Sequence, residues 1–181
     1  MTNEPDENEL VLGCIDGDDH AFEILLLRYQ RQVFNAVLRM VRNRDEASDL
    51  TQTTFLKAYE QLGSFDSRHK FFSWLYRIAI NESINHLRRR GRLEPLEGEW
   101  ASAARSPEDS AVGSDLSVHV QDALMSLSPD YRAVLVFRHF EDCSYEEIAS
   151  IVGVPTKTVK SRLFSARRQL KELLEARGIL R

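Results

Sequence analysis

The chain has 181 residues, a formal net charge of −4 and a hydrophobic fraction of 43%. This length suits one ordinary domain or two small ones, and no apolar run approaches the roughly 18 residues that a membrane span needs. The two cysteines, Cys14 and Cys143, form no CxxC motif or Cys/His cluster, so neither a zinc site nor a disulfide framework is indicated. We expect them to be isolated buried residues. The acidic N-terminus has no signal-peptide features, which favours a reducing cytosol.

The first half of the chain predicts three helices, because apolar residues recur there at three- or four-residue steps. The predicted helices cover residues 19–41, 45–62 and about 70–90. The buried stripe of the second helix is expected to be Ala47, Leu50, Thr54, Ala58 and Leu62. The inward residues of the third are expected to be Phe71, Leu75, Ile78 and Leu87. Together these helices predict a compact domain over residues 1–92.

The periodicity disappears over residues 93–115, which contain several Pro, Gly, Ser and acidic residues. This composition predicts a flexible acidic linker, which at ~3.3 Å per residue would reach roughly 75 Å when stretched. Ser128 followed by Pro129 predicts a helix start in the segment beyond it. The sequence therefore predicts an all-α protein in which a second small helical domain covers residues 116–181.

This second domain contains a helix-turn-helix pattern. Residues Ser144–Glu147 form a capping box that begins a short helix over residues 145–152. Gly153–Pro155 supplies the turn, and a last helix is predicted from about Thr156 to Ala176. In DNA-binding proteins with this layout, the second helix places its N-terminal residues in the major groove. Similar spacing also occurs in plain helical bundles.

Charge is unevenly distributed along the chain. Residues 68–92 carry seven bases against one acid, and residues 153–181 carry eight bases against two acids. Between them, residues 93–130 carry eight acids and one base. Two basic blocks separated by an acidic segment indicate two contacts with a polyanion, although each block taken alone is equally consistent with a solvated helix face.

The first basic block follows a segment, Ser64–Asn81, in which aromatic and basic residues alternate closely. Single-stranded nucleic acid is bound by this mixture, since rings stack on bases and cations follow phosphates. Any single aromatic here also suits a core position. We expect Phe71 and Leu75 to be core residues, and Trp74 is open to either interpretation.

Three segments resemble the extracytoplasmic-function (ECF) sigma factors of bacterial RNA polymerase. Ser144–Arg168, SYEEIASIVGVPTKTVKSRLFSARR, resembles the DNA-binding domain 4 of that family. Asn43–Leu62, NRDEASDLTQTTFLKAYEQL, resembles the polymerase-binding part of domain 2, and Ser64–Asn81 resembles its promoter-melting part. The resemblance implies a cytoplasmic initiation factor that binds core polymerase and opens the −10 element. It implies no enzymatic activity, no cofactor and no metal.

The resemblance also implies three sets of site residues. The docking face for the β′ clamp of core RNA polymerase would be Asp49, Gln52, Thr53 and Leu56. The −10 element would be bound by Phe65, Arg68, Lys70, Trp74, Arg77, Asn81 and Arg88, with loop 64–70 as a flipped-base pocket and Asn81 reading a base. The −35 element would be bound by Thr156, Lys157, Thr158, Lys160, Ser161, Arg162, Phe164, Arg167 and Arg168.

The sequence departs from the family pattern at two places. Ser165 stands where many members have a basic residue, and the pair Thr156–Lys157 replaces a more common apolar pair. Both differences bear on promoter preference. By resemblance alone, we also expect an anti-sigma partner that blocks access to polymerase or DNA.

Three other classes of protein remain as alternatives. A free-standing helix-turn-helix regulator would need neither the Asp49–Gln52 face nor the aromatic and basic segment. An enzyme acting on nucleic acid would need a carboxylate cluster, metal site or nucleophile–base pair, which the motifs do not supply. A helical adaptor would leave the charge blocks unexplained.

Overall fold

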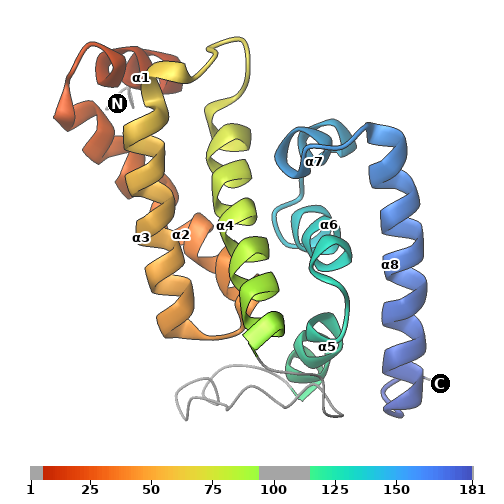
Figure 1. Ribbon diagram of the computed structural model, residues 1–181. Helices are drawn as coiled ribbons and strands as arrows, with labels where there is room; N and C mark the ends of the chain where they lie inside the picture. The colour runs from red at the N-terminus through yellow and green to blue at the C-terminus, as the bar shows by residue number, and fades with distance from the viewer. Residues whose placement is uncertain (1–5, 94–114, 181) are drawn as a thin grey trace, which may run out of the picture.

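The computed structural model describes residues 6–93 and 115–180, and every regular element in these ranges is helical (Figure 1). The elements in chain order are α1 (Glu7–Ile15), α2 (Asp19–Val41), α3 (Arg44–Gln61), the short 3-10 helix η1 (Leu62–Ser64), α4 (Phe71–Leu93), α5 (Asp115–Met125), α6 (Pro129–His139), α7 (Tyr145–Val152) and α8 (Thr156–Ala176). The all-α prediction with two helical domains is confirmed. Most of the predicted linker, residues 94–114, lies outside the described residues.

Helix α2 has a side-chain cap at its start and a left-handed residue at its end. The Asp18 side chain accepts hydrogen bonds from the amides of His20 and Ala21, which satisfies donors that the first turn leaves without partners. Arg42 closes the helix in a left-handed conformation with φ of 54°. Helix α1 was not expected from the sequence. It packs on α2, and its buried residues are Leu10 and Val11.

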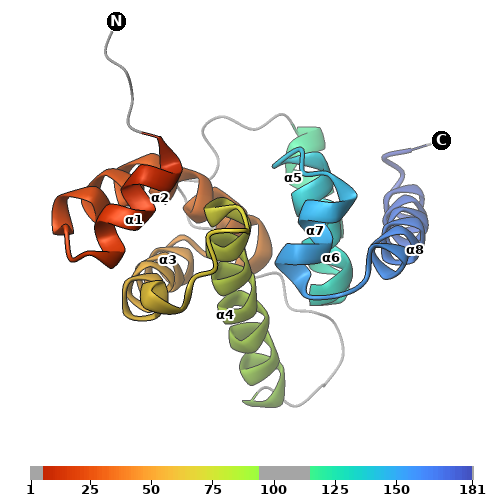
Figure 2. The same ribbon diagram turned by 90° about the horizontal axis from the view of Figure 1, so that it is seen from above.

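Helices α3 and α4 complete the first domain. All five positions of the predicted α3 stripe are buried. On α4, Phe71 and Leu75 are buried as predicted, but Ile78 and Leu87 are only half-buried. Additional α4 residues are buried, namely Ser73, Tyr76, Ala79, Ile80 and Ser83. The reason is visible in Figure 2: α4 lies between α2 and α3 on one side and the second domain on the other, so more than one of its faces is covered.

The second domain has the predicted helix-turn-helix. Ser128 caps α6, with Pro129 at the first helical position. At α7 the capping box is complete, because Ser144 accepts from the Glu147 amide and Glu147 accepts from the Ser144 amide. Gly153 ends α7 with φ of 69°, a left-handed conformation that glycine adopts at little cost.

The two domains share one continuous hydrophobic core. At its centre Arg132 is 1% exposed and donates to the backbone carbonyls of Leu124, Met125 and Leu127, and also to Met40 at the end of α2. Terminal helix carbonyls lack partners within their own helix and carry partial negative charge, so they stabilise the buried guanidinium. One side chain of α6 thereby joins both domains.

Candidate nucleic-acid interface

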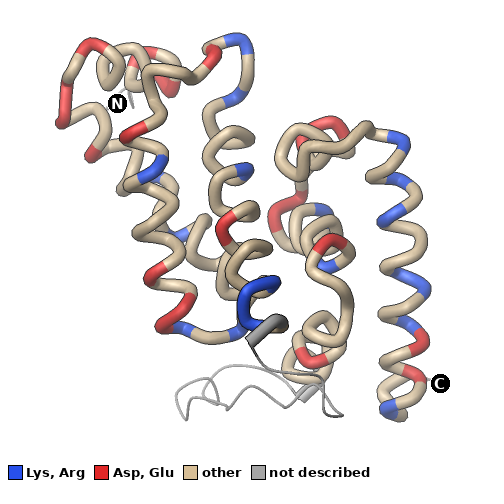
Figure 3. Tube along the Cα trace, in the orientation of Figure 1, with Lys and Arg blue, Asp and Glu red and all other residues tan. Residues whose placement is uncertain are grey.

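Helix α8 presents a basic face to solvent. Val159, Leu163 and Ala166 turn inward and are buried. The outward residues of the predicted set are Lys157, Lys160, Ser161, Phe164, Arg167 and Arg168, all of them exposed. Basic positions predominate along the first part of α8, whereas acidic positions join them towards its C-terminal end (Figure 3). The positive field is therefore strongest at the N-terminal half, which is the part that enters the groove in helix-turn-helix proteins.

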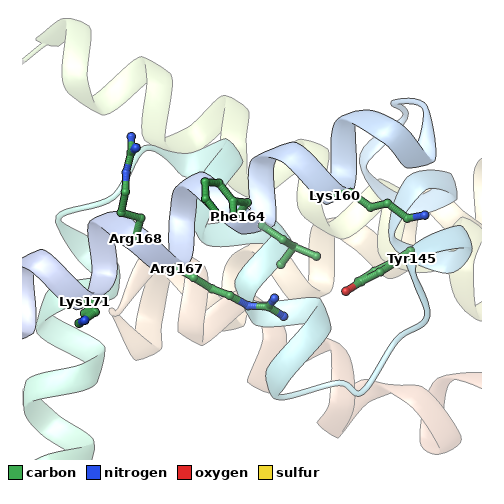
Figure 4. A pocket seen from close by; sticks show the side chains of 7 residues that line it. Tyr145, Lys160, Phe164, Arg167, Arg168 and Lys171 are labelled. Atoms are coloured by element: carbon green, nitrogen blue, oxygen red, sulfur yellow. The ribbon is translucent and has the colours of Figure 1, made fainter.

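An open pocket on this face is lined by aromatic and basic side chains from α7 and α8 (Figure 4). The ring of Tyr145 lies between the ends of Lys160 and Arg167, and the Lys160 ammonium is 5.8 Å from the ring centroid. Phe164 is 70% exposed, which is unusual for so large an apolar side chain. Tyr145 was not expected at this surface from the sequence; the available signal was a tyrosine directly after the capping serine.

Arg162 lies on a different side of α8 from these residues. It is only partly exposed, and its Nη1 lies 3.2 Å from Oδ1 of Asp130. The other oxygen of Asp130 is 3.5 Å from Nη2 of Arg88 on α4. Thr156 and Thr158 are also partly buried. The predicted −35 set is therefore divided between an outward face and a side that turns towards α6.

The predicted flipped-base loop, residues 64–70, is held by two kinds of contact. The buried ring of Phe65 packs against Phe71 and Trp74, with ring centroids 5.8 and 5.2 Å apart. Asp66 accepts bonds from the Arg68 amide and guanidinium, and these bonds hold the pKa of the Asp66 carboxyl well below its usual range. Phe65 thus anchors the loop from inside, while Arg68 and Lys70 stand at its surface.

The other predicted −10 residues extend along α4. Arg77, Asn81 and Arg88 are exposed, and Trp74 is half-buried. Lys70 donates to Glu147 of α7 over 2.7 Å, and this bond lowers the pKa of the Glu147 carboxyl. The Arg77 guanidinium lies against the helix-turn-helix turn, 3.5 Å from where a Cβ on Gly153 would stand. The structure therefore places several of these cations beside the second domain.

The predicted docking face occupies the solvent side of α3. Asp49, Gln52 and Leu56 are exposed along one side of the helix, and Leu56 is 60% exposed. Thr53 is partly buried and lines a separate pocket between α3 and α4, whose other lining residues include Glu46 and His86. The structure thus brings three of the four predicted residues onto one open surface.

Among residues 6–93 and 115–180, no group of three or more His, Cys, Asp or Glu side chains is arranged to hold a metal ion. None of the helices described here is both long enough and apolar enough to cross a membrane.

Comparison with known proteins gives matches over both domains. The family profile of Sigma-70 region 2 matches residues 25–93, and that of Sigma-70, region 4 matches residues 118–170. The chain is 37% identical to the RNA polymerase sigma-H factor of Pseudomonas aeruginosa, over 97% of this chain and 96% of that protein. It is 34% identical to the ECF RNA polymerase sigma-E factor of Haemophilus influenzae, over 97% and 98%.

A solved structure gives a similar result. The sigma factor RpoE, in complex with the anti-sigma factor NepR from Bartonella quintana, superposes with a TM-score of 0.69 at 31% identity. The match covers 85% of this chain and 96% of that chain.

Proposed function

This chain belongs to the ECF sigma factors, which direct bacterial RNA polymerase to specific promoters, and we propose that its two domains divide the polymerase and promoter contacts between them. Residues 1–92 would form domain 2, which binds core polymerase and opens the −10 element. Residues 116–181 would form domain 4, which reads the −35 element, with residues 93–115 as the linker. The chain contributes binding energy and is not an enzyme.

The basic outward face of α8 is the observation that carries the proposal for domain 4. Lys157, Lys160 and Ser161 stand exposed on its N-terminal half, where they reach base edges or phosphates in a major groove. Arg167 and Arg168 lie further along and bind phosphates, which adds affinity without sequence information. Arg162 reaches DNA only after it leaves Asp130.

Domain 2 would hold a separated −10 strand along loop 64–70 and α4. The loop is fixed from inside by Phe65, so an extruded base meets a surface that is already formed. Extracting a base costs a few kcal/mol, and such a preformed pocket offsets part of this cost. Asn81 offers an amide for base recognition, and Lys70, Arg77 and Arg88 follow the phosphates.

The α3 face formed by Asp49, Gln52 and Leu56 would dock on the β′ clamp of core polymerase, with Thr53 at its edge. An exposed leucine beside two polar side chains supplies the mixture of apolar area and directional contacts that protein interfaces use. We further propose a cognate anti-sigma factor, because the similar RpoE was solved with one, and a cytoplasmic location, where polymerase acts.

Run-off transcription tests the proposed function. Purified bacterial core polymerase is assayed on a library of promoter fragments, with and without the full chain. We expect defined transcripts only when the chain is added. Asp49→Arg should abolish these transcripts and prevent co-elution with core enzyme. Glu23→Arg makes the same charge change at an exposed position of α2 and should do neither.

Absence of transcripts together with tight duplex binding and no co-elution with core would overturn the sigma mechanism. It would favour a free-standing helix-turn-helix regulator instead.

A further inference from the structure

A hydrogen bond joins the last turn of α6 to the outward face of α8. The Nε of Arg167 donates to Nε2 of His139 over 3.4 Å, although the two residues are 28 positions apart in the sequence. Both residues are exposed. Helices α6 and α8 pack against each other and lie side by side in both ribbon views (Figures 1 and 2). One cation of the outward face is thus held by a second helix of the same domain.

The bond to His139 uses only one edge of the Arg167 guanidinium. A guanidinium has five N–H donors in a planar fork, one on Nε and two on each Nη. With Nε engaged by His139, the two Nη atoms remain for a second acceptor, and such a pair matches two oxygens of a phosphate. Figure 4 shows this end of Arg167 reaching across the open pocket toward Tyr145. The end of the side chain that faces the pocket is therefore the end that suits an anion.

The neighbouring arginine of α8 is held in a different way. The Nε of Arg168 lies 3.8 Å from Oε1 of Glu172, one turn further along the same helix. A carboxylate competes with phosphate for a guanidinium, because both are anions. A neutral imidazole does not compete in this way, since it accepts a hydrogen bond without adding negative charge. The partner of Arg167 therefore orients the guanidinium and leaves its charge available to DNA.

This role requires that the imidazole of His139 be neutral. Its Nε2 accepts a hydrogen bond only when the ring is uncharged and carries its proton on Nδ1. Partial burial of the ring lowers the pKa of His139 from its usual 6.5, and the nearby charges of Arg167 and Arg138 lower this pKa further. His139 is therefore an acceptor at pH 7.

We propose that His139 is a positioning residue for the −35 contact, which holds Arg167 by its Nε edge so that both Nη atoms meet one backbone phosphate. The inference rests on the proposed function, since α8 must lie against DNA for this phosphate to be present. An arginine held in this way loses less side-chain freedom on binding than one that moves in solvent. Because a phosphate contact carries no sequence information, the effect is the same on every duplex.

Substitutions at both ends of the bond separate positioning from other roles. His139→Leu removes the acceptor at an exposed position, whereas His139→Gln retains an acceptor in its amide oxygen. Arg167→Ala removes the side chain that His139 holds. The matched control is His119→Leu, which makes the same change at an exposed position of α5 in the same domain.

Binding of the full-length chain to a fluorescent pool of random-sequence duplex DNA is measured by anisotropy at pH 7 and low salt. We expect His139→Leu to weaken binding about fivefold, which is the effect of leaving one long side chain to be ordered on binding. His139→Gln and His119→Leu should bind as the wild type does. In a chain that already carries Arg167→Ala, His139→Leu should cause no further loss, because its effect passes through Arg167.

Wild-type affinity for His139→Leu, or an equal loss with and without the Arg167 side chain, would overturn the positioning role. A loss for His139→Gln as large as that for His139→Leu would overturn it as well. Run-off transcription by the wild type with core polymerase distinguishes these failures from failure of the proposed function. If defined transcripts appear while His139→Leu binds duplex DNA normally, only the role of His139 is wrong.

Discussion

Arg132 is the residue on which the packing of both domains depends most. Its guanidinium is buried and pairs with no carboxylate of residues 6–93 or 115–180. Burial lowers its pKa to about 10, so it stays charged at neutral pH. Its partners are backbone carbonyls of Leu124, Met125, Leu127 and Met40. A neutral replacement would remove these donors. The Leu124 carbonyl would still accept from the Leu127 amide, but the other carbonyls would lose their side-chain partner, and each unsatisfied group costs roughly 1–3 kcal/mol.

Arg132→Met should therefore lower the free energy of unfolding by about 3 kcal/mol, because methionine fills the volume but donates no hydrogen bond. Urea unfolding followed by circular dichroism measures the change. Arg168→Met is the control, since Arg168 is exposed and its pair with Glu172 is an ordinary surface contact. A loss for Arg132→Met as small as that of the control would show that water replaces the lost donors.

The two cysteines should differ in reactivity. Burial raises the pKa of the Cys143 thiol to about 12, so very little of it is the reactive thiolate at pH 8. Cys14 is only half-buried, contrary to the expectation that both are buried, and its pKa is raised as well. In native protein a disulfide-exchange reagent should label Cys14 first and Cys143 only as the chain unfolds. Equal labelling rates without denaturant would contradict this.

At the scale of elements, the sequence predicts helix ends well where a local signal exists. Ser128, the Ser144–Glu147 capping box and Gly153 each act within a few residues, and α6, α7 and α8 begin at the predicted residues. Helix α1 was missed because only Leu10 and Val11 of its nine residues are buried, which is too few for a periodic pattern. The extra buried positions of α4 were also missed, since they depend on a second domain far away in sequence.

The N-terminal half of α8 should dominate its interaction with DNA. Lys160→Ala should weaken binding to all duplexes alike and reduce the salt slope of log K by about 1, because one phosphate contact is lost. Lys171→Ala should have a smaller effect, since Glu175 already lies 3.5 Å from that ammonium. Fluorescence anisotropy across a salt series measures both. Equal slopes for the two variants would mean that DNA runs along the whole helix.

At the scale of the molecule, the packing of one domain on the other could not be predicted from local patterns. Lys70 and Glu147 are 77 positions apart, and neither is unusual in its own segment of the sequence. Arg132, a charge inside the apolar run YRAVLVF, was the one local sign of an unusual burial. The candidate DNA and docking residues came from the family resemblance, and the structure adds which of them are open to solvent in the isolated chain.

The packing of the second domain against α4, to which the Lys70–Glu147 contact contributes, should be insensitive to pH around neutrality. The bond from Lys70 holds the pKa of Glu147 below its usual 4.5, and the carboxylate raises the pKa of Lys70 above its usual 10.5. Because the pKa of the Glu147 carboxyl is lowered, its contribution to stability is present above the usual carboxyl pKa and is lost as the pH falls through the lowered pKa. Because the pKa of the Lys70 amine is raised, its contribution is lost only as the pH rises through the raised pKa.

The radius of gyration of the isolated chain, measured by X-ray scattering, should thus stay constant from about pH 5 to about pH 9 and increase at lower pH. Expansion already between pH 7 and 5 would contradict this assignment and would point to a histidine instead.

Asp130 couples the two arginines that we propose for the promoter elements. Its two oxygens pair with Arg88 of α4 and Arg162 of α8, so one carboxylate restrains an arginine proposed for each element. When one arginine moves to DNA, Asp130 no longer shares its charge between two guanidiniums and holds the remaining arginine more strongly. By linkage the effect is equal in both directions. A promoter carrying both elements should then bind less tightly than its separate halves predict, on the order of fivefold. Asp130→Asn should abolish this cooperativity in a comparison of full and half promoters, and an unchanged ratio would show that the two elements are read independently.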